Sequence, residues 1–220
     1  MTKRIGVLLS GCGALDGSEI HEAVLTLLAL DRAGVEILCT APDIDQIHVI
    51  NHLTQEETAD VRNVLVESAR IARGNIVDID ALDAQKIDGL ILPGGFGAVK
   101  NLCTFALKGP HGDVNPLVLE LVRLARAEKK PIGAIGISPA AVVMALKEAC
   151  QPSVTIGTDA GAAAAIHTMG GGHHACKVDE IHVDPVNRIV STPGYVLGAG
   201  IKEIAAGIEK LVQKVIELTD

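Results

Sequence analysis

A tight turn of small residues joins a predicted buried strand to a predicted helix in Pro131–Val143, PIGAIGISPAAVV. Many α/β enzymes hold a nucleophile at the tip of such a strand–turn–helix, where the sharp turn exposes one side chain at the sheet edge. The small residues Ala134 and Ser138 lie two positions before and after the tip, so the tip is Gly136. Glycine has no side chain. The segment therefore predicts a nucleophile turn without its nucleophile, with Ser138 as a flanking residue only.

Consecutive glycines follow another buried apolar run, in Leu92–Asn101, LPGGFGAVKN. Such a turn exposes backbone N–H groups at the carboxyl edge of a parallel sheet, where open α/β sheets bind ligands. The N–H groups of Gly94 and Gly95 can hold a carboxylate or a developing oxyanion. Two acids, Glu19 and Glu22, lie in the first turns of a predicted helix. The helix dipole explains Glu19, whereas Glu22 is a candidate for site chemistry.

The histidines have metal-like spacing but lack a full ligand set. His48 and His52 form H-x-x-x-H, which on a helix would put both rings on one face. The glutamate of a zinc protease is absent, and no third ligand follows. His173, His174 and Cys176 lie on a predicted strand, whose alternation puts His174 and Cys176 on one face. We therefore predict no metal site, and we expect one histidine of the second group to face a pocket.

A glycine-rich loop, Ser10–Gly17 (SGCGALDG), follows the first predicted strand. Its third glycine comes one position too late for the G-x-G-x-x-G dinucleotide fingerprint, in which that glycine lets the helix pack on the strand. The loop therefore predicts a tight turn over the carboxyl edge of the sheet and no nucleotide site. Cys12 lies in this loop, where we expect a buried thiol near the same edge as Gly136.

The composition restricts the class of protein. The chain has 220 residues, 48% of them apolar, with Phe96, Phe105 and Tyr195 as its aromatic side chains, so we expect one domain (1–220) with an aliphatic core. A net charge of −8 argues against nucleic-acid binding. No apolar run reaches the roughly 18 residues of a membrane span. Scattered cysteines and a start without a signal-peptide pattern favour reduced thiols and a cytoplasmic location.

Strand-like and helix-like segments alternate along the chain, and the strand-like ones are nearly continuous in apolar residues. This pattern predicts an α/β fold in three layers, with a mostly parallel central sheet and helices on both faces. Thr54 and Glu57 form a T-x-x-E capping box that predicts the start of a helix running toward Arg73. Asn115–Pro116 predicts another helix start, and a hairpin-like strand pair is predicted around Asp184–Asn187.

Three segments together resemble the PfpI-like, class I glutamine-amidotransferase-like superfamily: GSEIHEAVLTLLALDRAG, LILPGGFGAVKN and GAIGISPAAVV. More narrowly, the following segments are similar to the ElbB group (enhancing lycopene biosynthesis proteins, also described as glyoxalases): SGCGALDGSEIHEAVLTLLAL, VINHLT, RNVLVESARIARG, LPGGFGAVKNL, TIGTD and STPGYVL. The similarity covers nearly the whole chain. It implies a flavodoxin-like three-layer sandwich.

The resemblance also implies a site. Its members carry a cysteine on a strained turn, a glutamate that hydrogen-bonds to it, and glycine-turn amides that form an oxyanion hole. By position, Glu22 matches the glutamate, and Gly94 and Gly95 match the oxyanion turn. Ile137 follows the tip and is expected to contribute to ligand binding. The place of the cysteine is taken by Gly136.

The implied activity is that of a glyoxalase, in which a thiolate attacks glyoxal or methylglyoxal and a hydroxy acid results, without an added cofactor or metal. Gly136 excludes covalent catalysis at that position. The chain is then a variant or engineered form of a cysteine-containing parent, a non-catalytic small-molecule-binding or regulatory homologue, or a protein in which another group such as Cys12 has taken over. His173 matches a histidine of ElbB-like proteins and is a candidate base.

The resemblance implies three further properties. The ligand would be a small aldehyde or carboxylate, and the chain would form a homodimer. Proteins of the ElbB group are also described by the terms isoprenoid biosynthesis and lyase. A glutamine-handling amidotransferase half is disfavoured, because it needs the same cysteine and a downstream His-x-Glu pair. The nearest sequence to that pair is His182–Asp184, HVD, in which aspartate replaces glutamate.

Overall fold

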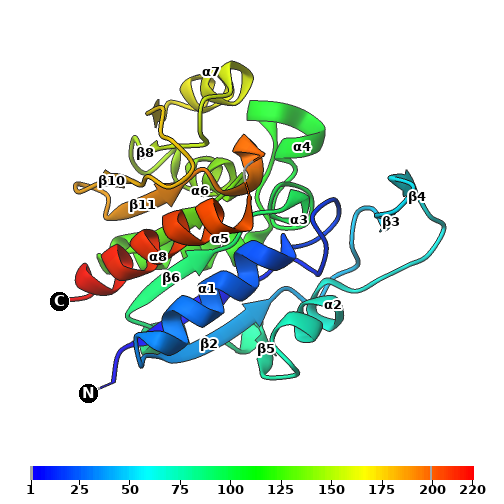
Figure 1. Cartoon of the computed structure of the whole chain (residues 1–220), viewed down its shortest axis with the longest axis horizontal. Coiled ribbons are helices and arrows are strands. Elements are labelled where there is room, and N and C mark those ends of the chain that lie inside the picture. The colour runs from blue at the N-terminus through cyan, green and yellow to red at the C-terminus, as the bar shows by residue number, and fades with distance from the viewer. Residues whose placement is uncertain (1, 199) are drawn as a thin grey trace.

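The computed structural model describes residues 2–198 and 200–220, and its centre is a seven-stranded sheet (Figure 1). The strands of this sheet are β1 (Arg4–Leu8), β2 (Glu36–Ala41), β5 (Ile76–Asp78), β6 (Gly89–Leu92), β7 (Ile132–Ile135), β10 (His182–Asp184) and β11 (Ile189–Thr192). Their spatial order is β10-β11-β7-β6-β1-β2-β5. All neighbouring pairs are parallel except β10 and β11. The predicted hairpin-like pair is therefore present as the antiparallel edge of an otherwise parallel sheet.

Two small sheets lie outside the central one. They are β3 (Ile50–Asn51) with β4 (Glu56–Glu57), and β8 (Ser153–Val154) with β9 (Gly172–His173). The first of these forms an arm that projects from the body of the molecule, at the right of Figure 1.

Helices cover both faces of the central sheet. They are α1 (Ile20–Arg32), α2 (Val64–Ile71), α3 (Phe96–Lys100), α4 (Phe105–Lys108), α5 (Pro116–Ala127), α6 (Ser138–Leu146), α7 (Ala160–Thr168) and α8 (Ile201–Glu217). One buried cluster joins α1, α2 and α8 to one face, and a second joins α3, α5 and α6 to the other. Strands β6 and β7 are buried along their whole length, as expected for parallel strands covered on both sides. The predicted three-layer α/β sandwich is confirmed.

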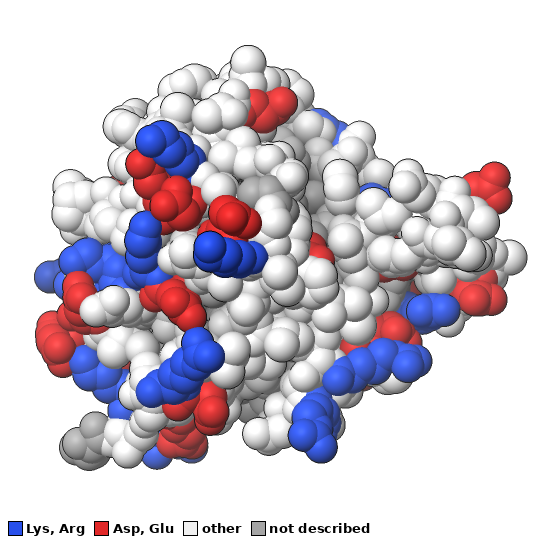
Figure 2. Space-filling view, viewed as in Figure 1, with Lys and Arg blue, Asp and Glu red and all other residues white. Residues whose placement is uncertain are grey.

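Charge is unevenly distributed over the surface. Figure 2 shows few charged side chains at the centre of one face, over α1, while acidic and basic side chains gather over α8 and around α2. Within the described ranges, no helix combines the length and hydropathy that crossing a membrane requires.

Of the two helix starts predicted from capping residues, one is correct and one is wrong. Asn115 caps α5, with its side chain accepting hydrogen bonds from two N–H groups of the first turn, as predicted. The capping box at Thr54 and Glu57 was a wrong prediction, because these residues lie in the β3–β4 arm. Helix α2 instead begins after Asn63, whose side chain accepts from Val66 N. A short-range pattern that suits a helix cap suits the polar tip of a hairpin equally well.

Candidate functional site

The turn after β7 has the predicted strand–turn–helix geometry. Gly136 forms its tip with φ +64°, a left-handed conformation that favours glycine. Its N–H donates to Thr192 O at 3.0 Å, which fixes the tip against the end of β11. The buried Ser138 hydroxyl donates to Leu92 O at 2.7 Å and accepts from Ile135 N at 2.9 Å. Ser138 is therefore a structural tie between β6 and β7, as its flanking position indicated.

Glu22 lies in the first turn of α1 and points its carboxyl group into the carboxyl edge of the sheet. The side chain is 1% exposed. Its Oε2 accepts from Gly94 N at 2.8 Å, and its Oε1 accepts from Tyr195 N at 2.8 Å. The carboxyl group therefore joins three segments that are far apart in the sequence: α1, the turn after β6, and the segment after β11.

Three glycines make room for this carboxyl group. A Cβ atom on Gly136 would lie 2.8 Å from each of the two carboxyl oxygens, closer than real side chains approach. A Cβ on Gly94 would overlap Oε2, and one on Gly194 would overlap Oε1. In this arrangement the carboxyl group of Glu22 thus occupies part of the space beside the tip of the turn.

Burial perturbs the acid strength of Glu22. Desolvation raises its pKa from 4.5 to about 7, and the nearby charge of Glu19 adds to the increase. The N–H groups of Tyr195 and Gly94 oppose the shift because they stabilise the carboxylate. Glu22 therefore exists in both protonation states near neutral pH, as a general acid–base group requires.

The glycine turn after β6 is locked onto the loop that precedes α1. Gly95 has φ +94°, and a Cβ atom there would overlap the backbone at Gly17 and Glu19. Gly94 O accepts from Glu19 N at 2.8 Å, while Gly94 N is already engaged by Glu22. The N–H groups of Gly95 and Ile137 donate to no other residue among those described. Both residues line the pocket described next, so these N–H groups are candidate donors to a ligand.

These groups line one pocket of about 430 Å³, which we call the Glu22 pocket. Its lining residues are Ala14, Leu15, Glu19, Glu22, Gly95, Phe96, Gly136, Ile137, Tyr195 and Val196. The structure thus brings together Glu22, Gly95, Gly136 and Ile137 as lining residues, with Gly94 bonded directly to Glu22. A weak acid, unpaired N–H donors and a turn tip without a side chain meet at the carboxyl edge of the sheet.

Cys12 and His173 do not line this pocket. Cys12 is only partly buried, so the expectation of a buried thiol was wrong. It lies beside α2, where burial and the charge of Glu67 raise the pKa of its thiol while Arg70 opposes the shift. His173 belongs to β9, and its Nε2 accepts from Ile156 N at 3.2 Å. Burial, together with neighbouring histidines, lowers the pKa of His173. Both side chains are thus engaged elsewhere in the fold.

The other histidine patterns take structural positions. His48 and His52 do not lie on a helix. The Nδ1 atom of His52 lies 3.0 Å from Ile50 O, and its Nε2 atom accepts a hydrogen bond from Leu15 N at 3.2 Å. His52 therefore orders the loop beside the pocket. His174 lies outside the strands and stacks on His182 at 4.1 Å. Within residues 2–198 and 200–220, no group of three or more His, Cys, Asp or Glu side chains is placed to hold a metal ion.

The sequence did not single out the residues that complete the pocket. Tyr195 contributes its N–H to Glu22 and its ring to the lining, and its hydroxyl lies 2.8 Å from His21 Nδ1. Leu15, Phe96 and Val196 form apolar lining. Only the resemblance of STPGYVL to the ElbB group drew attention to the segment that carries Tyr195.

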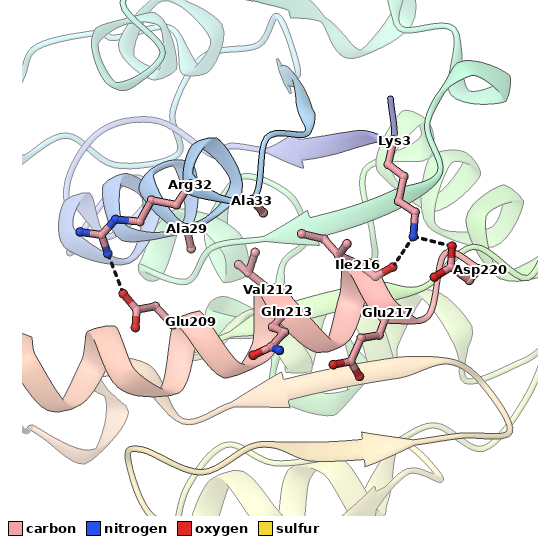
Figure 3. Close-up of a pocket in the computed structure, with 10 residues that line it drawn as sticks. All are labelled: Lys3, Ala29, Arg32, Ala33, Glu209, Val212, Gln213, Ile216, Glu217 and Asp220. Atoms are coloured by element: carbon pink, nitrogen blue, oxygen red, sulfur yellow. Dashed lines mark hydrogen bonds and ion pairs between the residues drawn. The ribbon is translucent and has the colours of Figure 1, made fainter. Parts of the chain in front are cut away.

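A larger groove of about 510 Å³ lies at the opposite end of the sheet, between α1 and α8. Figure 3 shows two ion pairs among its charged side chains: Arg32 with Glu209 at 2.9 Å, and Lys3 with Asp220 at 2.6 Å. The remaining charged lining residue, Glu217, pairs with Lys214. This groove lies beside the start of β1, whereas open parallel sheets bind ligands at the carboxyl ends of their strands. We therefore assign the candidate site to the Glu22 pocket.

Comparisons with known proteins match nearly the whole chain. The ES1 protein homolog, mitochondrial, of Rattus norvegicus is 43% identical over 226 residues, which cover 98% of this chain and 84% of the relative. The glutamine amidotransferase-like class 1 domain-containing protein 3, mitochondrial, of Homo sapiens is 43% identical over 98% of this chain and 83% of the relative. No protein-family model matches the chain.

Solved structures give the same fold. An isoprenoid biosynthesis protein with an amidotransferase-like domain from Ehrlichia chaffeensis has a TM-score of 0.91 at 40% identity, over 97% of this chain and 99% of that one. Drosophila melanogaster DJ-1beta has a TM-score of 0.59 at 17% identity, over 99% of this chain and 96% of that one, and it supports the fold alone. The flavodoxin-like sandwich expected from the sequence is confirmed.

The predicted cytoplasmic location is contradicted, because the names of both curated relatives place those proteins in mitochondria. Scattered cysteines without disulfide spacing indicate only that thiols stay reduced, and they do not distinguish one reducing compartment from another. The superfamily itself follows from the extent and level of the identities. The chain belongs to the glutamine amidotransferase-like class 1 family, on the fold shared with DJ-1 and PfpI proteins.

Proposed function

We propose that this chain is a glyoxalase-like member of its family, close to the ElbB group, whose pocket binds a small aldehyde or the hydroxy acid formed from it. Turnover is weak or lost, because the position of the nucleophile is Gly136. One observation carries the proposal. The buried Glu22 carboxyl group lies beside the tip of the turn, so near that a Cβ atom on Gly136 would be 2.8 Å from both of its oxygens. The name of the Ehrlichia chaffeensis protein refers to isoprenoid biosynthesis and specifies no reaction.

A slow reaction without a covalent adduct is compatible with the groups present. In the hydrate of a 2-oxoaldehyde, ionised Glu22 removes the proton from the hydrated carbon, and the electron pair of that C–H bond forms an enediolate with the adjacent carbonyl. The N–H groups of Gly95 and Ile137 stabilise the oxyanion. Glu22 then returns its proton to the adjacent carbon. The product is a 2-hydroxy acid, an isomer of the hydrate, so no oxidant or reductant is consumed.

The second candidate function is ligand binding without catalysis. It is favoured by the state of the other nucleophiles: Ser138 is buried with both of its hydrogen bonds satisfied within the protein, and Cys12 does not line the pocket. This candidate keeps the same ligand and the same pocket. It differs from the first in one result, because the native chain would bind a hydroxy acid but would not convert methylglyoxal at any pH.

The test is turnover of glyoxal and methylglyoxal by the native chain, Gly136→Cys and the matched control Gly136→Ala. Both variants add a Cβ beside Glu22, so their difference isolates the sulfur atom. We expect Gly136→Cys to exceed Gly136→Ala by on the order of tenfold or more and to lose the excess after treatment with iodoacetamide. A folded Gly136→Cys with no more turnover than Gly136→Ala would contradict the assignment of the turn. Turnover by the native chain that disappears in Glu22→Gln would favour the non-covalent route over binding alone.

A further inference from the structure

The Glu22 pocket is larger than the smallest 2-oxoaldehydes require. Its volume is about 430 Å³. Glyoxal has four non-hydrogen atoms, and at roughly 30 Å³ for each, the share of one water molecule in the liquid, it fills about 120 Å³. Most of the pocket therefore remains available beyond the groups that would hold the reacting carbons.

Polar groups of this pocket gather around the Glu22 carboxyl group, which accepts from the N–H groups of Gly94 and Tyr195. Glu22 and the free N–H groups of Gly95 and Ile137 meet at the sheet edge. Glu19, the other acid in the lining, caps α1 and accepts from Glu22 N at 2.7 Å. A bound aldehyde or carboxylate is therefore oriented with its polar end at Glu22.

Most of the remaining lining is apolar, and part of it is exposed. Phe96 is 46% exposed and Val196 is 37% exposed. Phe96 N donates to Ala14 O at 2.8 Å, and the ammonium group of Lys100 lies 5.4 Å from the Phe96 ring centre. The same ammonium group donates to Leu15 O at 2.9 Å. One lysine thus holds two of the apolar lining segments in place.

From this arrangement we infer that the ligand carries an aryl or branched alkyl substituent next to its polar end. The class is that of 2-oxoaldehydes with such a substituent and the matching 2-hydroxy acids, which the pocket binds in preference to glyoxal, methylglyoxal and their acids. The inference rests on the proposed function, because it assumes that the polar end of the ligand binds at Glu22. The substituent lies against Leu15, Phe96 and Val196, where it removes apolar surface from water.

The expected effect on affinity is large enough to measure. Adding even one methylene group to a ligand changes its affinity for a hydrophobic pocket by on the order of tenfold. We therefore expect mandelate, which carries a phenyl group, to bind the native chain at least about tenfold more tightly than lactate, which carries a methyl group.

Calorimetric titration of the native chain with mandelate and with lactate, at about pH 6, tests the inference. At that pH Glu22 is mostly protonated, since burial raises its pKa to about 7, and it does not repel the ligand carboxylate. Phe96→Ala and Val196→Ala reduce the apolar lining. Val186→Ala is the matched control, because Val186 is 79% exposed and does not line the pocket.

The inference predicts that the preference for mandelate over lactate falls in both lining variants and persists in Val186→Ala. Equal affinity for the two acids in the native chain would overturn the inference while leaving the proposed function intact. A preference that survives both lining substitutions would place the phenyl group elsewhere and would also overturn it. Binding of neither acid would refute the proposed function together with the inference. If Phe96→Ala does not fold, Val196→Ala and Phe96→Leu carry the same comparison.

Discussion

Replacing Glu22 by glutamine should remove a specific pH dependence of stability. The pKa of Glu22 is raised from 4.5 to about 7 by burial, so between these values the folded chain holds a proton that the unfolded chain has lost. The stabilisation of the folded chain by protonated Glu22 is complete below about pH 4.5 and disappears as the pH rises through about 7. One pKa unit is worth about 1.4 kcal/mol, so the native chain loses about 3 kcal/mol of unfolding free energy across this window from Glu22 alone.

Glu22→Gln keeps the shape but cannot ionise. Its amide group can accept from only one of the two N–H donors that hold Glu22, those of Gly94 and Tyr195, and it presents a donor to the other. This conflict costs about 1–3 kcal/mol at every pH. The variant should therefore be about 1–3 kcal/mol less stable than the native chain at pH 5. Because the native chain then loses about 3 kcal/mol by about pH 8, the difference should disappear or reverse.

Urea denaturation of both proteins at a series of pH values measures this difference. Subtracting the two curves removes the contributions of histidines and surface carboxylates that both proteins share. Parallel curves would refute the reasoning, because they would mean that Glu22 titrates at the same pH in the folded and unfolded chains. A gap that widens with pH would show that the N–H donors outweigh desolvation and that Glu22 is an ordinary ionised carboxylate.

The remaining predictions concern the backbone around the turn. Gly136→Ala should cost about 1 kcal/mol for its positive φ, plus about 1–3 kcal/mol for displacing Glu22 from its amide donors, measured by urea denaturation. Gly34→Ala is the matched control, because Gly34 has φ +70° and a Cβ atom there would have nothing within 4 Å. It should therefore cost only the roughly 1 kcal/mol that comes from the positive φ. Equal losses of stability in the two variants would mean that Glu22 moves freely. Ser138→Ala should lower stability by about 1–3 kcal/mol, because Ile135 N and Leu92 O lose their partner, and should leave ligand affinity unchanged; a change in affinity would place Ser138 in the site.

The sequence predicted the strand–turn–helix at Gly136 because that geometry depends on neighbouring residues. Glycine between a strand and a helix permits the left-handed conformation of a tight turn, and Gly136 adopts it with φ +64°. The raised pKa of Glu22 follows from the burial of its carboxyl group, which the sequence did not predict by itself. The flanking position of Ser138 and the glycine turn after β6 needed no long-range information.

Positions that depend on loop direction could not be predicted in the same way. Cys12 lies in a loop with several glycines, and nothing in its neighbours fixes whether its side chain faces Glu22 or α2. His173 was expected on a strand beside the pocket, but β9 pairs with β8 outside the central sheet. Phe96 and Val196 carry no chemical signature, since an apolar residue at a pocket rim looks like any other apolar residue.

The most direct test of the central claim locates the ligand. Backbone amide signals of the native chain can be followed by NMR as lactate is added, again at about pH 6, below the pKa of Glu22. The account predicts the largest shifts at the N–H groups of Gly95 and Ile137, with smaller ones at Tyr195. Shifts confined to other surfaces, such as the groove between Lys3 and Arg32, would contradict the claim that the Glu22 pocket is the functional site.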